Sequence, residues 1–133
     1  MKYYNMYLYQ TARVLAIVIL GQTLFFKYSG ADESVFIFQT LGMEPWGRYL
    51  TAVFESIAIV LIVFPKYVWL GAGIAINLMF GAILSHFVFL GIVVQDDGGL
   101  LFGLAFLVLL ASLYLVYCDF LKIPFIERRS SAR

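Results

Sequence analysis

Long apolar segments separated by short polar connections make up most of the chain. A helix needs about 20 residues to cross a hydrocarbon core of about 30 Å, because it rises about 1.5 Å per residue. The segments long enough to do so are Met6 to Phe26, Trp46 to Phe64, Tyr67 to Leu90 and Leu100 to Leu121. Tyr, Trp and Phe residues stand at most of their ends, as in the aromatic belts of membrane proteins. The pattern predicts an all-α membrane protein, an antiparallel bundle of four transmembrane helices.

The connection between the first two segments is itself partly apolar. Within it, Asp32-Glu33-Ser34 is typical of a helix start and Gly42 of a helix stop, with apolar residues at positions 35–38. An unstructured apolar loop would be costly at a membrane surface, because its backbone polar groups would lack partners. We therefore expect a short interfacial or re-entrant helix across the mouth of the bundle.

Basic residues gather at one end of the predicted bundle. The Pro65-Lys66 turn is so short that the helices it joins must be antiparallel neighbours, and with four spans both termini lie on its side of the membrane. That side carries the basic residues Lys2, Lys66, Lys122, Arg128, Arg129 and Arg133. The opposite side has only Lys27 and Arg48 among several acidic residues. The positive-inside rule places both termini in the cytoplasm, with residues 122–133 as a short basic tail.

Composition agrees with a membrane location. The chain has 133 residues, 63% of them hydrophobic and 13% charged, and the mean hydropathy is +0.94. A soluble domain carries about 25% charged residues, so here lipid must cover much of the surface. By length this is one domain, residues 1–133. The net charge of +1 excludes a nucleic-acid partner, because no basic stripe exists to neutralise phosphates.

The scarcity of cysteine and histidine restricts redox chemistry. Cys118 is the only cysteine, which excludes an intramolecular disulfide and a CxxC thiol-exchange motif. His86 is the only histidine, which excludes a bis-histidine haem held by one copy of the chain. The spacing of carboxylates around His86 predicts no metal site. Composition alone therefore assigns no cofactor to the chain.

Glu55 lies in the middle of the second predicted span, nine residues from Trp46 and nine from Phe64. A carboxylate at that depth costs on the order of 3 kcal/mol to insert, so it normally faces the bundle interior and marks a site. Arg48 and Thr51 share a helix face with it. Glu55 is thus a candidate catalytic and ligand-binding residue, and Arg48 a candidate ligand-binding residue. The alternative is a structural Glu55 paired with a base on a neighbouring helix.

The first span carries a stripe of its own on one helix face. Its members are Arg13, Ala16, Leu20, Thr23 and Lys27. Arg13 and Lys27 are candidate ligand-binding residues, and Lys27 lies at the same depth as Arg48 and Glu55. The alternative for both is a long side chain that extends to the interface near a helix end.

His86 lies near the end of the third span and is a candidate acid or base, together with Glu55. The alternative is a hydrogen-bonded core histidine. Gln22, Lys27, Arg48, Glu55 and His86 all fall between one interface and the middle of the membrane. We therefore expect them to surround one polar cavity, covered by the segment at residues 35–38.

These residues also resemble a known family. The matching positions are Arg13, Gly21 and Lys27 in the first span, Leu41-Gly42-Met43-Glu44-Pro45 before the second, Glu55 within it, and Ala82-x-x-x-His86 in the third. In this order and spacing, over residues 10–118, the chain resembles the DoxX family. The resemblance implies a small four-helix membrane protein. Some members are subunits of a thiosulfate–quinone oxidoreductase, and others associate with enzymes of oxidative-stress and thiol defence. The resemblance therefore implies a membrane subunit that docks a partner protein or handles a quinone, with quinone as the possible cofactor.

Three functions follow from these patterns. The first is an accessory subunit of a quinone-linked, sulfur or oxidative-stress redox complex in the bacterial inner membrane. The second is a small carrier or channel in which Glu55 and the basic residues bind an anion or relay protons. The third is a small isomerase-type enzyme that uses Glu55 and His86 as acid and base. A larger membrane complex or a second copy of the chain is the expected protein partner.

Overall fold

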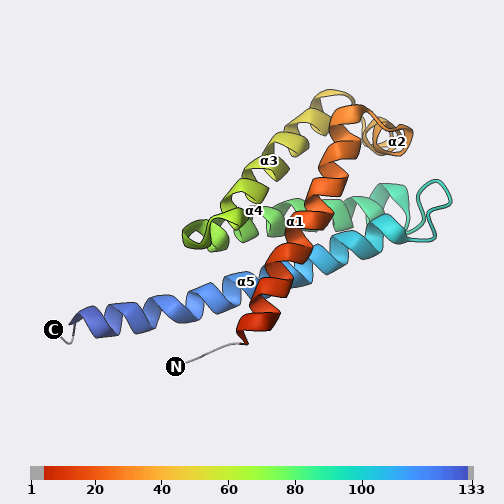
Figure 1. Cartoon of the computed structure of the whole chain (residues 1–133). Coiled ribbons are helices and arrows are strands. Elements are labelled where there is room, and N and C mark those ends of the chain that lie inside the picture. The colour runs from red at the N-terminus through yellow and green to blue at the C-terminus, as the bar shows by residue number, and fades with distance from the viewer. Residues whose placement is uncertain (1–4, 132–133) are drawn as a thin grey trace.

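The computed structural model describes residues 5–131, with side chains through Phe120. The elements, in chain order, are α1 (Met6–Ser29), α2 (Asp32–Thr40), α3 (Trp46–Val63), the 3-10 turn η1 (Pro65–Tyr67), α4 (Val68–Ser85), the π-helical turn η2 (His86–Leu90) and α5 (Leu100–Ser131) (Figure 1). Within the described residues, the helical segments long and apolar enough to cross a membrane are Met6–Ser29, Trp46–Val63, Pro65–Leu90 and Leu100–Phe120.

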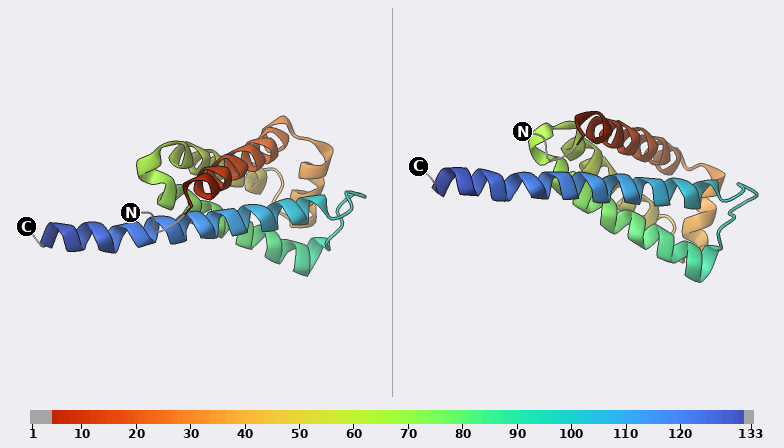
Figure 2. Two further views of the ribbon diagram at one scale, coloured as in Figure 1. Left: turned by 60° about the horizontal axis from the view of Figure 1, so that its bottom comes forward. Right: turned by 90° about the horizontal axis from the view of Figure 1, so that it is seen from below.

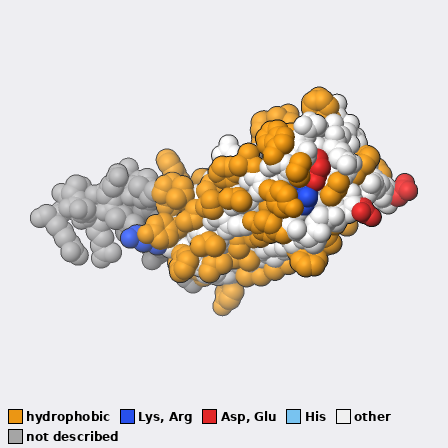
Figure 3. Space-filling model, turned by 90° about the horizontal axis from the view of Figure 1, so that it is seen from above, with side chains coloured by type: hydrophobic (Ala, Val, Ile, Leu, Met, Phe, Trp, Pro, Cys, Tyr) orange, Lys and Arg blue, Asp and Glu red, His pale blue; other side chains and the backbone are white. Residues whose placement is uncertain are grey.

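The predicted all-α membrane bundle is therefore confirmed, and the chain is an integral membrane protein with several spans. The backbone of α5 stays helical through Ser131, so most of the predicted basic tail continues the last helix. The side chains of that tail, and residues 132–133, lie outside the described part of the chain. Hydrophobic side chains cover most of the face seen in Figure 3, as a lipid-facing surface requires.

The helices form a closed ring in which α1 contacts α3 and α5, and α4 contacts α3 and α5. The α1–α3 pair lies across the α4–α5 pair (Figures 1 and 2). The η1 turn and the start of α1 lie at one end of the bundle, which we call the terminal end. Helix α2 and the 91–99 loop lie at the other, the α2 end. Helix α3 ends and helix α4 begins at η1, and the distance between the two helices grows toward the α2 end (Figure 1).

Small residues bring the helices together near the terminal end. Gly71 of α4 lies so close to α3 that an added Cβ would stand 2.7 Å from the carbonyl oxygen of Ala58. Ala58 and Ala75 are themselves fully buried, with 0% of their surface exposed. Short side chains let backbones approach where lipid supplies no hydrophobic driving force between helices. This half of the bundle is therefore packed without space between α3 and α4.

The predicted short helix is confirmed as α2, which begins at Asp32. Gly42 follows its end with φ +73°, a conformation that favours glycine and turns the chain toward α3. Ser34 and Phe38, one turn apart, are each 7% exposed and face the bundle. Helix α2 thus lies across the mouth of the bundle with its apolar face inward.

Candidate functional site

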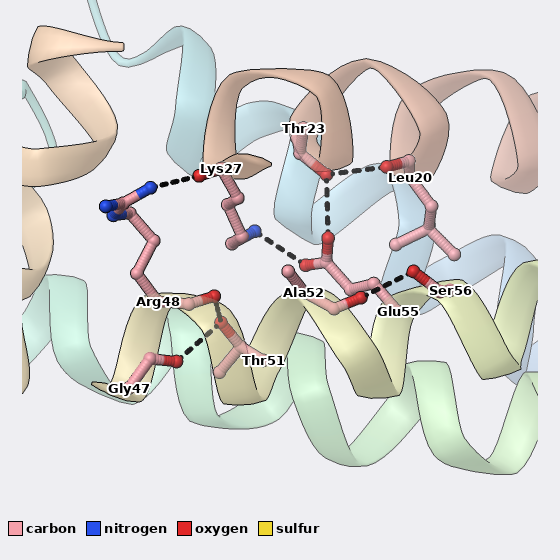
Figure 4. Close-up of polar contacts among 9 residues, drawn as sticks. All are labelled: Leu20, Thr23, Lys27, Gly47, Arg48, Thr51, Ala52, Glu55 and Ser56. Atoms are coloured by element: carbon pink, nitrogen blue, oxygen red, sulfur yellow. Dashed lines mark hydrogen bonds and ion pairs between the residues drawn. The ribbon is translucent and has the colours of Figure 1, made fainter. Parts of the chain in front are cut away.

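A buried ion pair joins α1 to α3 in the half of the bundle near α2. The Nζ atom of Lys27 donates a hydrogen bond of 2.7 Å to Oε1 of Glu55, and the Glu55 side chain is 2% exposed. The Thr23 hydroxyl, one turn before Lys27, lies 3.3 Å from the other carboxylate oxygen and 3.0 Å from the carbonyl of Leu20 (Figure 4). The single hydroxyl proton of Thr23 can go to either of these acceptors. Lys27 and Thr23 of α1 therefore both reach Glu55, as the α1 stripe at helical spacing allows.

A cavity of about 340 Å³ lies beside this ion pair. Its polar lining residues are Thr23, Lys27, Glu33, Ser34, Thr51, Glu55, Asn77, Ser85 and His86. The other lining side chains are mainly apolar, including Ile37 and Phe38 from α2 and Leu104 from α5. A cavity thus lies where the sequence predicts one, α2 covers it, and Lys27, Glu55 and His86 line it, but its lining is mainly apolar and not polar as expected.

His86 begins the π-helical turn η2 and is 4% exposed. Its Nδ1 lies 2.8 Å from the carbonyl oxygen of Gly91. Because a carbonyl only accepts, this contact assigns the proton of the neutral ring to Nδ1 and leaves a lone pair on Nε2. Within the described part of the chain, Nε2 has no hydrogen-bond partner. The ring packs edge-on against Phe102, with centroids 5.5 Å apart.

Two carboxylates that sequence reasoning did not assign to the site lie near the covered mouth. Glu33 of α2 lines the cavity, and burial together with the charge of Asp97 raises its pKa. Asp97 accepts hydrogen bonds from the backbone N–H groups of Val94, Gly99 and Leu101, at 3.0, 2.8 and 3.1 Å. Burial opposes ionisation of Asp97, but these bonds outweigh it and lower its pKa.

Arg13 and Arg48, both candidate ligand-binding residues, do not line the cavity. Arg13 donates to the carbonyls of Ile62 and Val63 at the end of α3, at 2.9 Å from one terminal nitrogen to each. Arg48, 5% exposed, donates to the carbonyl of Lys27 at the end of α1. Each arginine thus caps the C-terminus of the antiparallel partner helix, where the last carbonyls lack intrahelical donors.

Glu44 balances the charge of Arg48, with 2.9 Å between Oε1 and the second terminal nitrogen. The guanidinium group also lies over the Tyr49 ring, 4.5 Å from its centroid. The guanidinium group of Arg48 thus has a backbone carbonyl, a carboxylate and an aromatic ring of the protein as partners.

Gln22 is exposed on α1 and lies outside the cavity. Gln22 lies at the same depth in the membrane as the cavity, but its side chain is on a different face of α1. Conversely, Asn77 and Ser85 of α4 line the cavity although sequence reasoning left them out. Their spacing from Gly81, four residues each way, places all three on one face of α4 and is the signal that could have found them.

Among the described residues, no group of three or more His, Cys, Asp or Glu side chains is placed to hold a metal ion. Comparisons with protein-family models, curated proteins and solved structures find no match for the chain. Membership of the DoxX family therefore stays a prediction from the sequence.

Proposed function

We propose that this chain is a DoxX-like accessory subunit of a quinone-linked redox complex in the bacterial inner membrane. It holds a small molecule of the quinone type in the cavity beneath α2. Both termini are cytoplasmic in this proposal, following the excess of basic residues on their side. The observation that carries it is an apolar-walled cavity with a buried Lys27–Glu55 pair at its polar end.

The chemistry of the cavity suits a flat ring with oxygen substituents. Ligand pockets are mostly apolar, with a few polar groups that fix orientation, and their volumes run from about 300 to 1,000 Å³. The Lys27 ammonium donates, as a quinone carbonyl requires. The Glu55 carboxylate and the His86 Nε2 accept, as a quinol hydroxyl requires. One cysteine and one histidine supply neither a thiol pair nor a bis-histidine haem, so the proposal assigns electron transfer to a partner protein.

Packing at the terminal end supports a binding site in preference to a channel. The space between the cavity and that end holds buried side chains of all four long helices, among them Ala12, Ile62, Ala72 and Leu115. Farther along, Tyr9 donates a hydrogen bond of 2.8 Å to Asp119 in a buried contact. The Lys27–Glu55 pair is also neutral as a unit and offers no net charge to attract an anion.

An acid–base enzyme is the second candidate, because Glu55 and His86 line the same cavity. In that case one of the two groups takes a proton from a bound substrate, the other in its protonated form gives a proton at a second position, and a proton passing between them restores both. Turnover of a ring substrate that requires both residues would favour this candidate over simple binding.

The first test is purification in mild detergent, followed by mass spectrometry of bound small molecules and proteins and by quinone titration in nanodiscs. We expect quinone to bind the wild type, and the Lys27→Met/Glu55→Gln double variant to bind at least about tenfold more weakly, a loss of about 1.4 kcal/mol. The double variant removes both charges together and so leaves no unpaired buried ion.

Gln22→Leu is the matched control, since Gln22 lies on α1 outside the cavity, and it should bind quinone like the wild type. Equal quinone affinity of the double variant and the wild type would contradict the proposed site. Ion flux in proteoliposomes that is lost in Glu55→Gln, without a co-purifying partner, would favour the carrier instead.

A further inference from the structure

One face of α4 both lines the cavity and reaches the surface of the bundle. Asn77, Gly81 and Ser85 are four residues apart in turn and share that face. All three line the cavity, and Asn77 and Gly81 are also exposed. Because two of these three residues are exposed, the cavity is not enclosed along this face of α4. We call the gap beside these three residues the lateral opening.

The lateral opening arises because α3 and α4 separate along their length (Figure 1). Near η1, a Cβ added to Gly71 would stand 2.7 Å from the Ala58 carbonyl oxygen and 2.8 Å from Cγ1 of Ile62, both on α3. Ten residues farther along α4, a Cβ added to Gly81 would meet nothing within 4 Å. Helix α4 therefore touches α3 at Gly71, whereas at Gly81 it borders the cavity.

The depth of the lateral opening decides which phase it faces. Asn77 is 12 residues after Pro65 and 13 before Leu90, the ends of the third span. At about 1.5 Å per residue, it lies about 18–20 Å of helix from either end, and Gly81 is only about one turn closer to the α2 end. With a hydrocarbon core about 30 Å thick, the opening faces lipid tails and not water.

From this geometry we propose that the cavity is filled sideways from the bilayer by a lipid-dissolved molecule with a polar ring and a long apolar tail. The inference rests on the proposed function and deepens it. The ring lies inside, against Lys27 and Glu55, while the tail leaves through the lateral opening past Gly81. A cavity of about 340 Å³ is near the lower limit for ligand pockets, so a long tail has to remain outside.

The absence of a side chain at Gly81 is central to this arrangement, because a bulky side chain there would occupy the path of the tail. Gly81→Leu is therefore the test variant and Gly73→Leu its matched control. Gly73 is on the same helix and also has nothing within 4 Å of an added Cβ, but it does not line the cavity. Both variants add the same side chain to the same spanning helix. The comparison between them therefore removes effects of a leucine on helix stability or insertion that do not depend on the cavity.

The experiment compares two probes in nanodiscs: an isoprenoid quinone with a long tail, and a quinone with the same ring and no tail. We expect Gly81→Leu to weaken the long-tailed probe about tenfold, equivalent to about 1.4 kcal/mol, and to leave the tail-less probe within about twofold. Gly73→Leu should leave both affinities unchanged. Ser85→Phe, on the face of Gly81, should repeat the selective loss if Gly81→Leu fails to fold.

Equal loss of both probes in Gly81→Leu, or loss of neither, would overturn the lateral opening while leaving the binding site in place. If neither probe binds the wild type, the proposed function fails and this inference fails with it. The two failures are therefore distinguished by the wild-type titration alone.

Discussion

The two ends of the bundle both bury charged side chains, but they use them differently. At the terminal end, Arg13 donates to the carbonyls of Ile62 and Val63, and Tyr9 donates to Asp119. Arg13 is half-buried and Asp119 is buried, and neither residue lines the cavity. At the α2 end, the Lys27–Glu55 pair borders a cavity. A charge within a membrane helix therefore does not by itself mark a site; free space beside it does.

The two arginines of the α1–α3 pair are also charged residues within membrane helices that do not line the cavity. Arg13 and Arg48 lie near opposite ends of the α1–α3 pair, and each donates to carbonyls at the end of the other helix. A guanidinium group has five donors in a fixed plane, which suits several carbonyl acceptors at once. Their role is to hold α1 and α3 together, so the α1–α3 unit remains closed where α3 and α4 diverge.

The largest expected effect comes from breaking the ion pair at the α2 end. Lys27→Met leaves Glu55 buried without its counter-charge and should lower the free energy of unfolding by about 3–5 kcal/mol. Thermal unfolding in detergent measures this loss. Lys27→Met/Glu55→Gln should recover most of it, because no unpaired charge remains. Lys66→Met, at an exposed position in η1, is the control; a double variant no more stable than Lys27→Met would refute the pairing.

At the terminal end, Arg13→Met should lower the free energy of unfolding by about 2–3 kcal/mol, since charged hydrogen bonds to partly buried carbonyls are lost. Arg13→Lys should restore only part of it, because an ammonium group lacks the planar fork. Thermal unfolding and quinone titration together check this. Quinone affinity should stay at the wild-type value, and a variant that unfolds normally but binds weakly would place Arg13 in the site after all.

Tyr9→Phe should have a smaller effect on unfolding, about 1–2 kcal/mol, because the Asp119 carboxylate loses one donor in a buried contact. The measurement is the midpoint of thermal unfolding at neutral pH. Tyr7→Phe, the same substitution at a position of α1 that is 86% exposed, should change little. No difference between the two variants would show that the Tyr9–Asp119 contact does not stabilise the terminal end.

The smallest effect concerns Glu33 at the mouth of the cavity. Its pKa is raised by burial and by Asp97, so its protonated form is favoured in the folded protein. Stability from this group is complete below its ordinary pKa of 4.5 and is lost as the pH rises through the raised value. Glu33→Gln should therefore be slightly more stable than the wild type at neutral pH, by thermal unfolding across a pH series.

The stability contributed by Asp97 changes with pH in the opposite direction, so the pH series distinguishes the two carboxylates. Its pKa is lowered, so its stabilising effect is present above its ordinary pKa of 3.8 and is lost as the pH falls through the lowered value. A Glu33→Gln variant that is less stable than the wild type at neutral pH would contradict the repulsion between these residues.

The periodicity of the sequence was sufficient to predict the spanning helices and the depth of each charged residue in the membrane. It placed Lys27, Glu55 and His86 at one level of the membrane, and the structure brings them to one cavity. The depth of a residue in the membrane does not tell which neighbouring helix its side chain faces. For that reason Arg48 and Gln22, at the same level, do not line the cavity.

Contacts between separate connections were also beyond sequence reasoning. Glu33 and Asp97 lie in different connections, 64 positions apart (97 − 33), and interact because α2 folds back over the bundle mouth. The divergence of α3 and α4 likewise depends on packing at Gly71, which a helix pattern does not reveal.

The Lys27–Glu55 pair also has a consequence for how the protein is made. Helix α1 is synthesised before α3. Until α3 is inserted, the ammonium group of Lys27 at the end of α1 can extend to the membrane interface. Glu55 then enters the hydrocarbon at a cost on the order of 3 kcal/mol unless it meets that ammonium group. Residues 68–85 and 100–118 contain no Asp, Glu, Lys or Arg and can insert on apolarity alone. We expect the α1–α3 hairpin to form during synthesis, before the last two spans have left the ribosome.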